Sequence, residues 1–279
     1  MTIKILTCFH KPYITPRNDI YMPIHVGKAN SNLDLGFIGD DTGDNISSKN
    51  PNYCELTALY WAWKNLNADY VGLCHYRRYF DFRNINGIID ENEIGTQDFQ
   101  DFVDINIQNK LNDIFNNEYD IILPKRKVWD ISLYDDYCKN HNKEELDILI
   151  KVIIEKYPEY KEAINKILSK NNKAYICNMF IMKKDELNKY CSWLFDILFE
   201  VEKRVTISKD AYQSRIFGFM SERLINIYVE KHKLKVKELP LIFIGEKETY
   251  RDKRNIIFKI SRLEAGKLKR NLKFKLKNV

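Results

Sequence analysis

The sequence predicts an α/β fold in which helices flank a mixed central sheet, and three observations lead to it. Short apolar runs typical of buried strands alternate with longer amphipathic segments typical of helices. Near the N-terminus these runs follow in the order strand, strand, helix, strand, which favours a layered α/β arrangement. No internal repeat or low-complexity linker divides the chain. We therefore expect one domain over residues 1–248 and a separate tail over 249–279.

Length and composition are consistent with a single folded domain. The 279 residues are long for one α/β domain and short for two, and 44% hydrophobic residues can build a core. No apolar stretch approaches the roughly 20 residues needed to span a bilayer, and the N-terminus does not resemble a signal peptide. The six cysteines form no CxxC pair, which indicates reduced thiols in a cytoplasmic protein.

The first third of the chain is expected to hold three strands and one helix, followed by a loop. Apolar runs predict strands at 3–9, 33–38 and 70–74. Pro51 suits the first turn of a helix that continues with apolar residues at helical spacing. Residues 81–100 are polar with weak periodicity, so a long surface loop is expected there.

The remaining elements follow from the same patterns. Strands or extended segments are expected at 119–123, 174–182 and 236–244. Helices are expected at 102–115, in two pieces over 143–170 separated at Pro158, at 185–201 and at 211–231.

The stretch from Asp69 to Phe80 contains the most informative residues. The strand at 70–74 runs directly into His75, Tyr76, Arg77 and Arg78. Ligands of open α/β sheets bind at the carboxyl ends of strands, and two adjacent guanidiniums suit a doubly charged diphosphate. The alternative is that both arginines are solvated charges at the start of a loop.

Other chemical motifs are absent or weak. The five histidines show no metal-ligand spacing, and the chain has neither GxxxxGK[ST] nor GxGxxG. Asp40, Asp41 and Asp44 could surround a divalent ion, although acids beside glycine are more typical of a solvated turn. No Asp-x-Asp follows an apolar strand, so no metal site and no cofactor beyond weak divalent-metal dependence is predicted.

Two polar groups lie within otherwise apolar elements. On the predicted helix at 211–231, Arg215 and Glu222 interrupt an aromatic face. They could form an internal ion pair, or Glu222 could face a cleft as a general base. Asn178 lies in a buried run and needs a partner, either the backbone or a sugar hydroxyl.

The charge is concentrated in the tail. From Arg251 to Val279 there are eleven Lys or Arg and two acids, a balance of +9, so the rest of the net +6 chain carries −3. Large apolar residues are interspersed among these cations, as in segments that lie on anionic membranes. Membrane binding by 251–279 is preferred over nucleic-acid binding, which is the alternative.

Two segments carry a resemblance to a known family. The runs Asn52 to Asn65 and Tyr70 to Phe80, with later motifs Asn178 to Phe180 and Gln213 to Leu224, resemble the DUF4422 family of bacterial glycosyltransferases. The resemblance covers roughly residues 3 to 245 and implies a GT-A-like fold. It implies transfer of a hexose, with galactofuranose or galactose as the best guess, from a UDP-sugar to a glycan or lipid-linked glycan acceptor. The setting would be capsule, O-antigen or lipooligosaccharide assembly at the inner face of the cytoplasmic membrane.

Site roles follow from this resemblance as expectations. The donor nucleotide and its diphosphate would contact nine residues: Thr7, His10, Lys11, Asp40, Asp41, His75, Tyr76, Arg77 and Arg78. Arg77 and Arg78 would stabilise the leaving diphosphate in place of a metal ion. Inverting transfer needs a carboxylate base, for which Asp210 and Glu222 are candidates, and Asn178 and Arg215 would bind the acceptor.

Two other classes of function stay open at this stage. A protein with this fold could bind a nucleotide sugar without turning it over, or the basic tail could bind nucleic acid with steep salt dependence.

Overall fold

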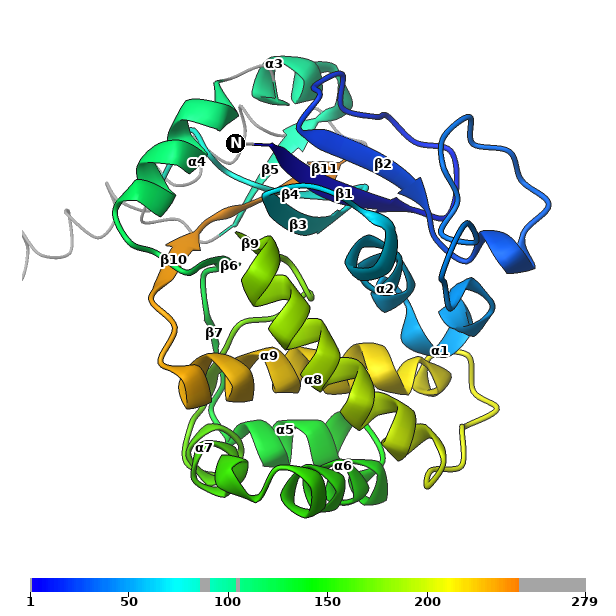
Figure 1. The fold of residues 1–279 in the computed structure, drawn as a ribbon, viewed down its shortest axis with the longest axis vertical. Helices are drawn as coiled ribbons and strands as arrows, with labels where there is room; N and C mark the ends of the chain where they lie inside the picture. The colour runs from blue at the N-terminus through cyan, green and yellow to red at the C-terminus, as the bar shows by residue number, and fades with distance from the viewer. Residues whose placement is uncertain (1, 86–90, 104–105, 246–279) are drawn as a thin grey trace, which may run out of the picture.

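A computed structural model describes residues 2–85, 91–103 and 106–245, and all structural statements below concern these residues (Figure 1). Nine strands form one mixed sheet, and β7 and β8 form a separate two-stranded ladder. The strands are β1 Ile3–Phe9, β2 Tyr21–His25, β3 Tyr70–His75, β4 Arg78–Phe80, β5 Glu91–Gly95, β6 Ile121–Pro124, β7 Lys127–Val128, β8 Lys173–Ala174, β9 Phe180–Lys183, β10 Val236–Leu239 and β11 Leu241–Gly245.

Strand β3 lies at the centre of the sheet. It runs parallel to β1 on one side and antiparallel to β9 on the other. The sheet continues from β1 to β2, and from β9 through β6 to β10. A Cβ at Gly72 would lie 2.8 Å from Ile181 of β9 and 3.1 Å from Ile5 of β1, so the close packing at this point requires glycine.

At its carboxyl end β3 turns back on itself. His75 pairs with Arg78, so Tyr76 and Arg77 form a two-residue turn into the antiparallel strand β4. β4 then pairs with β11, which pairs with β5. This turn places both arginines at the carboxyl end of β3.

Helices cover both faces of the sheet (Figure 1). α3 and α4 pack on one face, where a hydrophobic cluster includes Phe99 and Leu111. α2, α8 and α9 pack on the other face, and α5, α6 and α7 form a further layer beneath α8 and α9. The helices are α1 Asn50–Tyr53, α2 Leu56–Asn65, α3 Phe99–Val103, α4 Ile107–Asn116, α5 Leu133–Asn140, α6 Lys143–Lys156, α7 Lys161–Ile164, α8 Lys184–Glu202 and α9 Ile216–His232.

Polar side chains fix the starts of several helices. Asn106 accepts from the backbone N–H of Asn109, and Ser132 accepts from that of Asp135. Asn142 does the same for Glu144. Each cap satisfies a backbone donor that the first helical turn leaves without a partner.

The α/β fold with a mixed sheet is confirmed, but several strands differ from the prediction. Residues 33–38 are not a strand, since Leu33 and Ile38 are 47% and 38% exposed and only Gly39 forms a bridge, to His25. The second strand of the chain is β2 instead, which pairs with β1 on the side away from β3. The segment at 81–100, predicted to be a loop, contains β5. Its charged residues do not show the apolar pattern of a strand, but pairing with β11 holds it in the sheet.

The helical boundaries also differ from the prediction. The expected helix at 102–115 is two helices, α3 and α4, and α5 was not predicted. The segment that follows Pro51 is broken at Cys54, which has a φ of 52°. The last long helix begins at Ile216, and a 3₁₀ turn over Gln213–Arg215 precedes it.

Other expectations concern the cysteines, the membrane and the tail. All six cysteines lie in described residues, and none forms a disulfide in the structure. Across the described ranges, no helix has the length and apolarity that a bilayer crossing requires. The domain limit at 248 and the basic tail over 251–279 lie outside the described residues.

Candidate functional site

A cavity of about 990 Å³ opens at the carboxyl ends of β1 and β3. Its wall contains cations, carboxylates and thiols from segments far apart in the sequence. The lining residues used below are Cys8, His10, Cys54, Glu55, His75, Tyr76, Arg77, Arg78, Glu93, Cys177, Arg215, Glu222 and Phe243. The volume lies in the range of pockets that hold small organic ligands.

The β3–β4 turn supplies the positive wall of the cavity. Arg77 is exposed, with its guanidinium 5.3 Å from the centre of the Tyr76 ring. Arg78 is half-buried, 5.1 Å from the centre of the Phe243 ring. The backbone N–H of Ile244 donates to the carbonyl of Arg77, which ties the turn to β11. Both guanidiniums therefore belong to a fixed turn and border the cavity, rather than starting a loose loop.

Tyr76 joins this turn to the loop after β1. Its ring lies 5.2 Å from the rings of both His10 and Tyr13, in edge-to-face geometry. The ammonium of Lys11 lies 5.8 Å from the same ring. Burial, with the nearby charges of Lys11 and Arg77, lowers the pKa of His10, so its imidazole is neutral at pH 7.

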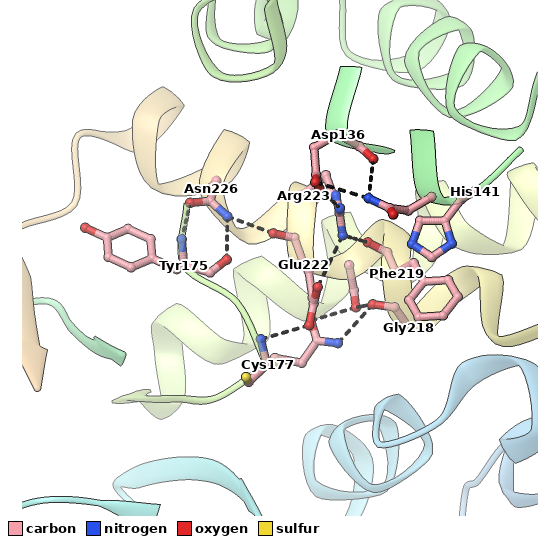
Figure 2. Close-up of polar contacts among 12 residues, drawn as sticks. Asp136, His141, Tyr175, Cys177, Gly218, Phe219, Glu222, Arg223 and Asn226 are labelled. Carbon is pink, nitrogen blue, oxygen red and sulfur yellow. Dashed lines mark hydrogen bonds and ion pairs between the residues drawn. The ribbon is translucent and has the colours of Figure 1, made fainter. Parts of the chain in front are cut away.

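Glu222 of α9 is the carboxylate of this site with the most complete support (Figure 2). Its Oε1 accepts from the backbone N–H of Cys177 at 2.8 Å, and its Oε2 pairs with Arg223 at 3.2 Å. Burial raises the pKa of Glu222, while the Arg223 charge and the Cys177 hydrogen bond lower it in part. A carboxylate with a raised pKa beside a cavity is suited to accept a proton.

Arg223 links Glu222 to helix α5. Its guanidinium also pairs with Asp136 at 3.2 Å and donates to the carbonyl of Phe219 (Figure 2). The side chains of Arg223 and Asp136 are only 11% and 13% exposed. A nearly buried pair is held tightly, because breaking it would leave an unpaired charge away from water. Arg223 thus fixes where the Glu222 carboxylate points.

A turn at Cys177 and Asn178 interrupts the predicted strand at 174–182. Both residues have positive φ, 73° and 48°. The carbonyl of Cys177 accepts from His75 Nε2–H at 2.7 Å, while its N–H holds Glu222. This turn therefore connects the end of β3 to the carboxylate of α9.

Asn178 has protein partners on both ends of its amide. Its Nδ2 donates to Glu55 Oε1 at 2.6 Å and to the carbonyl of Gly218 at 3.0 Å. Its Oδ1 accepts from Ser221 Oγ at 2.7 Å. Asn178 is buried and does not line the cavity, so the structure gives its amide a role in positioning Glu55.

Replacing Asn178 by alanine is expected to lower the free energy of unfolding by about 1–3 kcal/mol, because Ser221 and Gly218 lose a buried partner. Alanine also tolerates the positive φ less well than asparagine. Urea unfolding followed by circular dichroism measures the change, with the exposed Asn67→Ala as control. Equal stability of the two variants would contradict the positioning role.

Glu55 is a site residue that the sequence analysis did not single out. It follows Cys54 at the break between α1 and α2 and borders the cavity. The available signal was that Glu55 is the only charged residue between Lys49 and Lys64. Glu93 was missed for another reason, since its strand β5 was expected to be a loop.

Arg215 lines the cavity, as expected of a binding residue, but its partner was not foreseen. Its Nε donates to Cys54 Sγ at 3.3 Å. The ion pair of Glu222 is made with Arg223, so the expected Arg215–Glu222 pair is not the one observed. Burial and the neighbouring Glu55 raise the pKa of Cys54 to about 11, which keeps this thiol protonated at neutral pH.

Several predicted site residues lie away from the cavity wall. Thr7 is buried against Cys74, and Asp40 is fully buried, where it accepts from the N–H groups of Gly27 and Lys28. Asp41 is exposed on the same loop. Asp210 accepts from the N–H groups at the start of the 3₁₀ turn. These side chains shape loops around the site, and the structure does not bring them into it.

Within the part of the chain that the structure describes, no three His, Cys, Asp or Glu side chains gather closely enough to hold a metal ion.

The fold and the cavity together define an α/β protein with a large cavity at the carboxyl ends of its strands, where ligands of open α/β sheets bind. More specifically, the chain belongs to the DUF4422 family, described as "Domain of unknown function (DUF4422)", whose sequence profile matches residues 4–233. No curated protein sequence matches the chain.

One solved structure is similar over most of this chain. It is described as "WbbM bifunctional glycosytransferase apo structure" and is 36% identical, with a TM-score of 0.79. The match covers 88% of this chain and 46% of that one, so the chain spans less than half the length of WbbM. The fold expected for a glycosyltransferase domain is therefore confirmed.

Proposed function

We propose that this chain is a glycosyltransferase that moves a hexose from a UDP-sugar to a glycan acceptor. The observation that carries the proposal is the cavity itself, where Arg77 and Arg78 border the same space as the half-buried carboxylate Glu222. The similarity to a bifunctional glycosyltransferase, over a fold with this cavity, supports the same reaction class. Galactofuranose or galactose is the proposed sugar.

The arginine pair is the proposed diphosphate site. Arg77 and Arg78 can each donate two parallel hydrogen bonds to phosphate oxygens, and their charge opposes the negative charge that develops on the leaving UDP. His10 and Tyr76 border the same wall and would contact the donor beside them. With two fixed cations in this role, transfer is proposed to proceed without a metal ion or with weak metal assistance only.

Glu222 is the proposed general base. In an inverting displacement the acceptor oxygen bonds to the anomeric carbon, the bond from that carbon to the diphosphate breaks, and the acceptor proton moves to the carboxylate. Glu222 would take that proton, and UDP would leave with the electron pair. Arg215, on the same cavity wall, is the proposed acceptor contact.

The biological setting is proposed on the chemistry of the expected substrates. Transfer to a glycan or lipid-linked glycan would take place in capsule, O-antigen or lipooligosaccharide assembly. The protein would be cytoplasmic and peripheral on the inner face of the membrane, with the basic residues 251–279 on anionic lipid.

A ligand panel tests this function. UDP and UDP-sugars should raise the melting temperature more than GDP, CMP and their sugars, and UDP should be released only when an acceptor is present. Binding without release would favour the alternative of a nucleotide-sugar-binding protein. No response to any nucleotide would refute the proposal.

Metal dependence is a separate prediction. Turnover in excess EDTA is expected to remain close to that in buffer, because the guanidiniums of the β3–β4 turn supply the positive charge. The measurement is UDP release before and after chelation, followed by addition of Mn²⁺. Loss of turnover in EDTA that Mn²⁺ restores would overturn the metal-independent mechanism.

A further inference from the structure

A second cavity is lined by residues that do not belong to the candidate site. Its volume is about 750 Å³, and it is bordered by the β7–β8 ladder, the C-terminal half of α9, and β10. No lining residue is shared with the first cavity. In Figure 1 these elements lie at the left, whereas α1, which borders the candidate site, lies at the right.

The wall of this cavity is basic. Its cations outnumber its carboxylates by five to two, with Arg126, Lys166, Lys170, Lys173 and Lys233 against Glu230 and Glu238. Glu230 pairs with both Lys166 and Lys233, and Glu238 pairs with Arg126. In the described ranges Lys170 and Lys173 are exposed and their ammonium groups contact no carboxylate. The face therefore presents positive charge that the residues described by the structure do not neutralise.

Exposed apolar side chains adjoin these cations. Val128 is 59% exposed and pairs across the ladder with Lys173. Ile131, three residues further along, is 38% exposed. The backbone of Trp129, which lies between them, is held by Asn172. The Trp129 N–H donates to the Asn172 carbonyl, and the Trp129 carbonyl accepts from Asn172 Nδ2. Exposed aliphatic and basic side chains are thus neighbours at the β7–β8 ladder, where Val128 lies opposite Lys173 of the cavity wall.

This combination discriminates between classes of anionic ligand. Single-stranded nucleic acid is held by stacking of bases on exposed aromatic faces, whereas the exposed large apolar side chains of this face, Val128 and Ile131, are aliphatic. A soluble phosphate would use the cations but leave the apolar side chains in water. A lipid surface accommodates both the cations and the apolar side chains, because apolar side chains enter the headgroup region while Lys and Arg remain among the phosphates.

We propose that the face made of the β7–β8 ladder, Ile131 and the rim of the basic cavity binds the surface of an anionic phospholipid bilayer. This surface is separate from the tail and belongs to the folded domain. Docking through it uses none of the residues that line the first cavity. The proposal does not rest on sugar transfer.

Vesicle binding of the full chain tests the proposal. Lys170→Gln with Lys173→Gln should lower partitioning onto phosphatidylglycerol-containing vesicles by about 25-fold, from the usual contribution of each cation near such a surface. The control is Lys64→Gln with Lys151→Gln, which removes the same charge from exposed positions on α2 and α6. The tail is identical in both variants, so their difference reports the folded face. Equal partitioning of the two variants would overturn the proposal.

A second measurement reports where the face lies. Brominated lipids should quench part of the tryptophan fluorescence, and Trp129→Phe should remove that part. Val128→Ser should weaken vesicle binding while leaving the circular dichroism spectrum unchanged. Absence of quenching, or saturable binding of inorganic pyrophosphate that requires Lys170 and Lys173 without vesicle binding, would replace the bilayer by a soluble phosphate ligand and refute the proposal. No nucleotide sugar is present, so the result is independent of the proposed transferase activity.

Discussion

Replacing Arg77 and Arg78 together by alanine is expected to lower kcat/KM for sugar transfer by at least about 10²–10³-fold, the usual cost of losing one preorganised donor to a developing anion. Both guanidiniums border the cavity on a turn held by β11. Their removal would leave the diphosphate without fixed positive charge while the ladder hydrogen bonds of the turn persist. UDP affinity should fall as well, because the diphosphate is already charged before transfer.

Lysine and a nearby arginine provide the controls. Arg77→Lys and Arg78→Lys retain charge but lose the paired hydrogen bonds, so partial activity is expected. Arg83→Ala removes a guanidinium that lies 4.5 Å from the centre of the Phe102 ring and does not line the cavity. Its activity should match the unaltered protein. Full activity in the double alanine variant, with an unchanged far-ultraviolet spectrum, would refute the diphosphate assignment.

Glu222→Gln is expected to lower kcat by about 10²–10⁴-fold, the range for loss of a general base. Glutamine keeps an oxygen that can accept from the Cys177 N–H, so the surrounding turn should stay in place. The matched control is Asp210→Asn, which keeps the oxygen that caps the 3₁₀ turn and lies outside the cavity. If Glu222→Gln retains turnover and Glu55→Gln loses it, the base is Glu55.

The pH profile gives a second test of Glu222. A base must be deprotonated to act, so kcat should rise with pH through the pKa of Glu222. Because burial raises that pKa, this limb should lie at higher pH than for an ordinary glutamate. Arg223→Met removes a charge that lowers the pKa and should move the limb further up, whereas Arg223→Lys should restore it toward its original position. An unchanged limb in Arg223→Met would contradict the role of this pair.

Local patterns predicted the parts of the fold that depend on near neighbours. The strand from Tyr70 was visible because four consecutive residues after it are buried on both faces. Helix α8 was predicted almost to its ends, since its buried residues recur at helical spacing. The identity of β2 was not predictable in this way, because β2 and the run at 33–38 look alike and only pairing with β1 separates them.

The residues of the candidate site also fall into those that local sequence reveals and those that only distant contacts define. Arg77 and Arg78 were found because strand, turn and charge are consecutive in the sequence. Glu222 could be noticed but not assigned, because its partner Cys177 lies 45 positions away along the chain, and Asp136, which holds Arg223, lies 87 positions from that arginine. The Asn178–Glu55 contact spans 123 positions, and no local pattern contains it.

The sequence by itself determined the α/β class, the family, the arginine pair at the end of the central strand and the concentration of charge in the tail. These depend on the order and spacing of neighbouring residues, which the backbone converts directly into strands, helices and turns. Only the tertiary structure decided which carboxylates border the cavity and which residues support them. Those contacts join distant segments, and burial, which sets their hydrogen bonds and pKa values, exists only once the chain has folded.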